Sequence, residues 1–143
     1  MELIQEFSLR KQLANQNLIM GGIIVLISII MFFLIGNLMM IGPGILLLVI
    51  GGLNQNLKVV KVYPEYLEVK LGVLASKKFI RYNQITQFKA VNKILEIHYN
   101  TDEGKSKKVR IAKRALEQED IIAINNFLSE HTDLDSNNSW INE

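Results

Sequence analysis

Hydrophobic and polar positions change pattern along this chain, and the longest apolar segment comes first. Residues 18–53 include no charged side chain. A run of this length is typical of a membrane segment, because a core helix rarely has more than about 14 such residues. As a single helix it would be about 54 Å long, against a hydrocarbon core of about 30 Å. The sequence therefore predicts a two-helix transmembrane hairpin over residues 18–53.

The break between the two helices is expected between Gly36 and Gly44. Gly36-Asn37 is a turn dipeptide, and Pro43 between two glycines disfavours a continuous helix. We predict a first helix over residues 18–35 and a second from residue 38 or 43 to residue 53. A kink at Pro43 inside the second helix is one alternative. Another is a single span followed by a buried core helix.

Basic residues flank the apolar run on both sides. Arg10 and Lys11 precede it, Lys58 and Lys61 follow it, and the connecting loop contains no Lys or Arg. Basic flanks favour the cytoplasmic side, so both termini are expected there, with residues 1–17 as a cytoplasmic or interfacial segment. The run is too long for a secretory signal peptide, and no small-x-small cleavage site follows it.

Two glycine pairs, Gly21-Gly22 and Gly51-Gly52, would lie at the same depth in such a hairpin. Glycine lets helix backbones approach closely where lipid offers no hydrophobic drive. We therefore predict that all four glycines pack the helices together, although glycine is common in membrane helices in any case.

After residue 57 the apolar positions alternate with polar ones, which is typical of half-buried strands. We predict strands at 57–63, 66–71, 77–82, 84–91, 93–100 and 107–112. Gly72 is expected in a turn between two antiparallel strands. The alternation assigns one core to six residues: Leu67, Val69, Leu95, Ile97, Val109 and Ile111.

A helical period then covers residues 115–131, and a polar, acidic segment follows at 132–143. Short loops between short strands favour antiparallel pairing. The predicted fold is thus a membrane helical hairpin plus a small antiparallel β barrel or sandwich, residues 57–131, closed by a C-terminal helix. We expect residues 132–143 to be a disordered tail.

Charge is distributed unevenly along the chain. Residues 58–114 contain fourteen Lys and Arg against five acids, a net +9, whereas residues 115–143 are −7. Such asymmetry suggests a charged partner for the basic block, and an anionic leaflet is the nearest one. The alternative is a solvated surface. The candidate anionic-surface residues are Lys70, Lys77, Lys78, Arg81, Lys107, Lys108 and Arg110.

Two stretches carry a resemblance to a family. The run from Tyr66 through Gly72 to Leu74, and the segment from Phe79 to Ile85, resemble the bacterial pleckstrin-homology-like domains of small membrane proteins. That family pattern has a proline after the first isoleucine of the second stretch, and Arg81 stands here instead. Folds of this kind have seven strands, one more than the six predicted here. The resemblance implies a generally non-catalytic scaffold that binds protein or lipid.

No nucleophile, phosphate loop or zinc motif is present, and there is no cysteine, so we expect neither an enzyme nor a cofactor. His98 and His131 lack metal-ligand spacing and are expected to be solvated. The calcium-like stretch at 133–138 has Asn138 where the loop needs glycine. A nucleic acid partner is disfavoured because the basic strands carry no pair of stacking aromatic residues.

The pattern as a whole predicts a membrane-anchored binding or adaptor module at the cytoplasmic leaflet. Its expected partners are membrane lipids and a protein partner or a second copy of the chain. A different reading stays open, in which the chain is an accessory subunit that binds a membrane complex through its hairpin.

Overall fold

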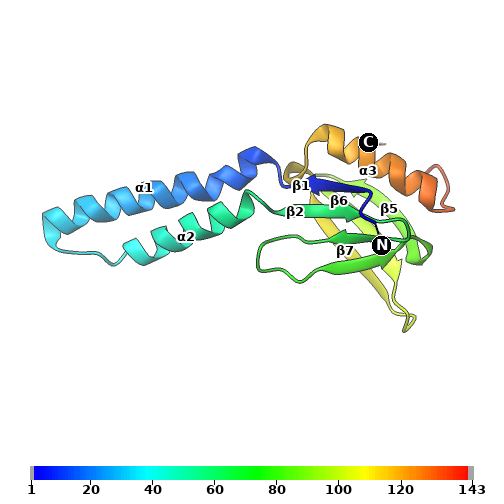
Figure 1. Cartoon of the computed structure of the whole chain (residues 1–143), viewed down its shortest axis with the longest axis horizontal. Helices are drawn as coiled ribbons and strands as arrows, with labels where there is room; N and C mark the ends of the chain where they lie inside the picture. Colours follow the sequence, from blue (N-terminus) through cyan, green and yellow to red (C-terminus); the bar gives the residue numbers. More distant parts are fainter. Residues whose placement is uncertain (1, 142–143) are drawn as a thin grey trace. The chain divides into compact units, whose positions relative to one another are not determined.

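The computed structural model describes residues 2–141 and divides into two compact units (Figure 1). One unit is a helical hairpin of residues 9–57. The other combines the residues before the hairpin, up to Ser8, with those after it, from Lys58. The hairpin is therefore inserted into the β unit, which is discontinuous in sequence.

The hairpin consists of α1 (Lys11–Ile35) and α2 (Ile41–Asn54). α1 begins seven residues before the predicted start, because the polar segment ahead of Leu18 continues the helix. It ends at Gly36, which adopts a left-handed conformation with φ 72° and donates its N–H to the Phe32 carbonyl. Pro43 lies in the first turn of α2, where no helical partner for its missing N–H is needed.

One of these helices has the length and composition of a membrane span. Among the described residues, only α1 is long and apolar enough to cross a membrane, and its most apolar 18-residue stretch has a mean hydropathy of 3.0. α2 is apolar but has only 14 residues.

Small residues allow α1 and α2 to approach closely. A Cβ added to Gly21 would lie 2.8 Å from the backbone N of Leu48, and one added to Gly51 would lie 2.7 Å from that of Leu18. Real Cβ atoms do not come this close, so the predicted packing role is confirmed for both glycines. It is wrong for Gly22 and Gly52, since an added Cβ there would meet nothing within 4 Å.

A third packing glycine was missed. A Cβ on Gly44 would lie 2.7 Å from Cγ2 of Val25, yet the sequence analysis assigned Gly44 to the break between the helices. Consecutive residues of a helix lie on different faces. Gly21 and Gly51 lie on the face toward the partner helix, and the adjacent Gly22 and Gly52 do not.

The β unit contains two antiparallel sheets. Sheet A has the order β1 (Gln5–Ser8), β2 (Lys58–Val62), β3 (Tyr66–Val69) and β4 (Lys78–Arg81). Sheet B has the order β5 (Ile85–Val91), β6 (Ile94–Asn100) and β7 (Ser106–Ala112). α3 (Gln118–His131) follows. The described residues thus form two sheets and a C-terminal helix, and no closed barrel.

The six predicted strands are confirmed, with ends that differ by two residues at most. β1 was missed. It pairs with β2 through Phe7 and Val60, and Phe7 is buried. Residues 1–17 are therefore not a separate segment, because residues 5–8 complete sheet A and residues 11–17 begin α1.

The predicted core is confirmed. The six alternating residues are buried: Leu67, Val69, Leu95, Ile97, Val109 and Ile111. Gly72 lies in the turn between antiparallel β3 and β4, where its carbonyl accepts a hydrogen bond from the Ala75 N–H at 3.1 Å.

The expectation of a disordered tail is wrong for the described part, residues 132–141. Trp140 is 1% exposed, and its backbone N–H donates to Oδ1 of Asn125 on α3 at 2.8 Å. Ser139 forms a parallel bridge with Lys89 on β5. Burial of one large aromatic side chain holds this polar segment in place. Residues 142 and 143 lie outside the described residues.

Candidate functional site

The seven predicted basic residues lie in three groups on the two sheets. Three lie at the ends of the β3–β4 connection: Lys70, Lys77 and Lys78. Arg81 is at the other end of β4. The remaining three lie on β7 of the other sheet: Lys107, Lys108 and Arg110. Each group has different neighbours, so each has a different electrostatic character.

The first group surrounds the loop that joins β3 to β4. Lys77 Nζ lies 3.0 Å from Oε1 of Glu68, whose side chain is almost fully buried. The hydrogen bond to this carboxylate raises the pKa of Lys77. Within the described residues, Lys70 and Lys78 take part in no ion pair. Two of the three ammonium groups are thus available to an external anion.

Arg81 is already paired within the β unit. Its Nη1 lies 3.6 Å from Oδ1 of Asp102, in the loop between β6 and β7. Gln84 donates to the same Asp102 oxygen at 2.7 Å. Both side chains of the ion pair are largely exposed, so the interaction is weak but lowers the local positive charge.

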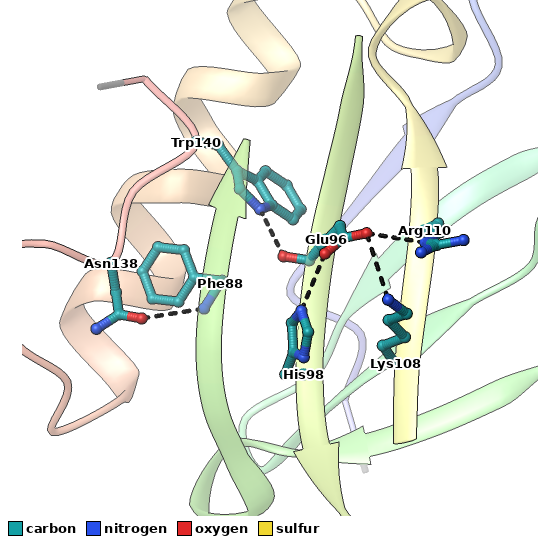
Figure 2. A network of polar contacts seen from close by, with 7 residues as sticks. All are labelled: Phe88, Glu96, His98, Lys108, Arg110, Asn138 and Trp140. Atoms are coloured by element: carbon teal, nitrogen blue, oxygen red, sulfur yellow. Dashed lines mark hydrogen bonds and ion pairs between the residues drawn. The ribbon is translucent and has the colours of Figure 1, made fainter. Parts of the chain in front are cut away.

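The third group surrounds a buried carboxylate, as Figure 2 shows. Glu96 lies in the middle of β6 with its side chain only 10% exposed. Arg110 Nε donates to Glu96 Oε1 at 2.8 Å, and Lys108 Nζ lies 3.8 Å from the same oxygen. Nε2 of His98 lies 3.0 Å from Oε2. Both carboxylate oxygens are therefore occupied from β6 and β7.

This arrangement keeps Glu96 ionised. The hydrogen bond from His98, and then that from Arg110, holds the pKa of Glu96 below its ordinary value. Lys108 and Arg110 consequently balance an internal charge, and only Lys107 of this group takes part in no ion pair within the described residues. The expectation that His98 is solvated is wrong, since it is half-buried against Glu96.

The C-terminal segment also contacts sheet B, through hydrogen bonds to β5 and β6. The Trp140 indole N–H donates to the Glu96 carbonyl at 3.2 Å, and the Phe88 N–H on β5 donates to Asn138 Oδ1 at 3.1 Å (Figure 2). Figure 2 shows Glu96 contacted at two places, its carbonyl by Trp140 and its carboxylate by side chains of β6 and β7. The sole signal for this contact in the sequence is the single tryptophan in an otherwise polar segment.

Within residues 2–141, no group of three or more His, Asp or Glu side chains is arranged to hold a metal ion. His131, at the end of α3, stacks on Phe127 with ring centroids 3.8 Å apart. A cavity of about 340 Å³ lies at the base of the hairpin. It is lined by Leu9, Lys11, Ala14, Asn15, Gln55 and Asn56.

The first basic group also contains an apolar tip, which was not predicted from the sequence. Leu74, midway along the β3–β4 loop, is 90% exposed, and Leu71 is 44% exposed. Phe79 on the adjoining strand is also exposed, and its ring meets Tyr66 edge-on at 5.8 Å. The signal was present as two leucines between Lys70 and Lys77, Leu71 at the end of a predicted strand and Leu74 outside the predicted strands.

Comparisons of the chain with protein-family models, with curated proteins and with solved structures found no match. Its function must therefore be inferred from the geometry of the two units themselves.

Proposed function

We propose that this protein is a membrane-anchored, non-catalytic binding module that presents its β unit at the cytoplasmic leaflet and recognises anionic lipid there. The hairpin supplies the anchor. Apolar side chains on α1, including Phe33 and Leu34, are largely exposed, and burial in lipid would remove them from water.

The pairing of β1 with β2 is the observation that carries the proposed topology. β1 precedes α1 and β2 follows α2, yet the two strands share one sheet. Both ends of the hairpin must then lie on one side of any bilayer, so the intervening chain crosses it an even number of times. If α1 spans the membrane, α2 together with the segment before it must cross back to the side on which β1 lies.

The dimensions fit this proposal. The apolar part of α1, residues 18–35, is about 27 Å long at about 1.5 Å per residue, close to a hydrocarbon thickness of about 30 Å. α2 alone reaches only about 21 Å, and residues 36–40 supply the remainder. Within that connection Asn37 Oδ1 accepts the Met39 N–H at 2.8 Å, which satisfies one backbone donor. Basic flanks favour the cytoplasm for both ends.

Lipid recognition is supported by those of the seven candidate residues that take part in no ion pair within the described part of the chain: Lys70, Lys78 and Lys107. Near an anionic leaflet each such residue contributes about 1 kcal/mol if it lies within a Debye length. The family resemblance forms part of the same proposal, since seven strands and a closing helix are compatible with a pleckstrin-homology-like domain.

The test uses the full chain reconstituted in phosphatidylcholine bilayers with trace spin-labelled phosphatidylglycerol or phosphatidylcholine. We expect several-fold stronger association of the anionic label at low salt, and a decline as salt is raised. Replacing Lys70, Lys78 and Lys107 with Gln should remove most of this preference. The charge-matched control replaces Lys89, Lys93 and Lys105 with Gln and should retain it.

Equal association of both labels at low salt would contradict lipid recognition. A preference that both triple variants retain would assign the selectivity to the hairpin flanks, Arg10 and Lys11, and would also contradict it.

A further inference from the structure

We propose that the β3–β4 loop, residues 70–77, inserts its apolar tip into the headgroup region of the bilayer that holds the hairpin. This inference rests on the proposed function, because it requires the β unit to lie at that leaflet. It adds a second mode of attachment, apolar insertion, to the electrostatic one.

The loop has the chemistry of an interfacial membrane segment. Its tip exposes Leu74 almost completely, together with much of Leu71. Lys70 precedes the tip, and Lys77 and Lys78 follow it. Apolar side chains at the acyl boundary, with ammonium groups beside them at the phosphate level, are the combination that binds anionic leaflets. At 90% exposure, Leu74 buries little of its apolar surface within the β unit.

Local hydrogen bonds hold the tip away from the sheet. The Ala75 N–H donates to the Gly72 carbonyl and closes a turn. Val69 and Lys78 pair at the base of the loop, and Lys77 is fixed by Glu68. The loop is thus a structured projection, and insertion would require little additional ordering.

Strand register places this loop at the membrane-linked end of sheet A. Ser8 pairs with Lys58 at the end where β1 leaves and β2 begins. The Lys70 N–H donates to the Val59 carbonyl at 2.9 Å, and Lys78 pairs with Val69. The loop therefore starts and finishes beside the two links to the hairpin. Figure 1 shows β1 and β2 side by side, with the loop between the two green strands that follow.

The links are too short to let this end move far from the bilayer. Residues 9 and 10 join β1 to α1, and residues 55–57 join α2 to β2. Three extended residues span about 10 Å at most. Four residues of a loop can project about 13 Å, so the tip can reach the interface.

The test uses single-cysteine variants, which are straightforward because the chain contains no cysteine. A nitroxide is attached at Leu74→Cys, or at Glu103→Cys as the matched exposed control. Glu103 lies in the β6–β7 loop, whose neighbour Asp102 pairs with Arg81 at the opposite end of β4. Full-length protein is placed in nanodiscs of phosphatidylcholine, with or without phosphatidylglycerol. Collision rates are then measured with oxygen, which enters lipid, and with a water-soluble nickel complex.

We expect the nitroxide at 74 to collide with oxygen at least threefold more, relative to the nickel complex, than the one at 103. Preferential nickel collisions at both positions would overturn the inference. A nitroxide at 74 shielded from both agents would also overturn it, because a second copy of the chain would then cover the tip.

The outcomes for the two proposals can be separated. Insertion at 74 in neutral and anionic discs alike would support the loop while contradicting anionic recognition. A spin-labelled lipid preference that persists without insertion at 74 would refute the loop alone. Fluorescence of the buried Trp140, the only tryptophan, confirms that each variant is folded.

Discussion

At the residue scale, Glu96 shows how a strand on the surface of a small domain can carry a nearly buried charge. An unpaired carboxylate in this position would be strongly unfavourable. Here Arg110 and His98 each bond one oxygen, and Lys108 lies close by. Removing a single partner leaves the carboxylate incompletely satisfied, which is more costly than replacing the whole group with neutral residues.

This network predicts a specific dependence of stability on pH. Because the folded-state pKa of Glu96 is below its ordinary value of 4.5, its contribution is fully present above about pH 4.5. The contribution is lost as pH falls through the folded-state pKa, since the unfolded chain then binds the proton more readily. Glu96→Gln should flatten the acid side of the stability profile, followed by Trp140 fluorescence during thermal unfolding in mild detergent.

The matched control is Glu103→Gln, which removes a carboxylate from an exposed pair with Lys105. This variant should keep the wild-type acid profile. Identical profiles for Glu96→Gln and wild type between pH 5 and pH 3 would show that Glu96 does not contribute this linkage.

The face of a strand on which a residue lies could be predicted from the alternation of apolar and polar positions. Contacts with residues distant in sequence could not. The alternation that assigned Leu95 and Ile97 to the core also leaves Glu96 and His98 on the other face of their strand. Nothing local indicated that Lys108 and Arg110 neutralise Glu96, because the register between β6 and β7 determines that contact. Trp140 lies in a segment whose polar composition is typical of disorder, and its binding place is formed by residues at least fifteen positions away.

At the scale of elements, the strands after the hairpin were predictable because each alternates and is bounded by turn residues. β1 was not, since it has four residues and its partner follows about 50 residues later. The first residue of α2 could not be predicted because of Pro43. A proline can interrupt a helix, but it is equally compatible with the first turn of one. The contact surface between α1 and α2 was only partly predictable. The spacing of the glycine pairs does not indicate which glycine of each pair faces the other helix.

The glycine contacts predict a contrast within each pair. Gly21→Ala and Gly51→Ala should each force the helices apart and destabilise the hairpin by about 1–3 kcal/mol, because the added Cβ meets backbone atoms. Gly22→Ala and Gly52→Ala have open space and should be neutral or slightly stabilising. Fluorescence transfer between probes at exposed Phe33 and Leu46, titrated with sodium dodecyl sulfate, measures the difference.

Equal midpoints for Gly21→Ala and Gly22→Ala would contradict this assignment of the contact surface. The neighbouring variants differ by one position and have the same composition, so helix propensity is matched.

At the scale of the whole molecule, the discontinuity of the β unit is the feature that no local pattern predicts. A fragment starting at residue 57 and ending at 131 follows the predicted domain but lacks β1 and Trp140. It would leave the edge of β2 unpaired and expose the site that Trp140 occupies. The helical hairpin was predictable because a long uncharged run needs no knowledge of distant contacts, and its two crossings of a membrane stay a prediction.

The proposed two-span topology is tested by labelling single cysteines in intact cells with an impermeant maleimide. Asn37→Cys, in the connection between the helices, should react from outside the cell. Glu103→Cys, in the β unit, should react only after the membrane is opened. Reaction of both or of neither before lysis would contradict a hairpin that crosses twice.

The insertion of the hairpin between β1 and β2 also sets an order of events during synthesis. Translation adds about 5–20 residues per second, so β1 waits about 3–10 s before β2 leaves the ribosome. During that interval the nascent strand has no partner, and in the proposed two-span topology only correct return of the second helix would bring one to the same compartment. A chain whose second helix failed to return would leave β1 and β2 on opposite sides of the bilayer, with buried valines and Phe7 exposed to proteases. Under that proposal, completion of sheet A would act as a checkpoint for membrane insertion.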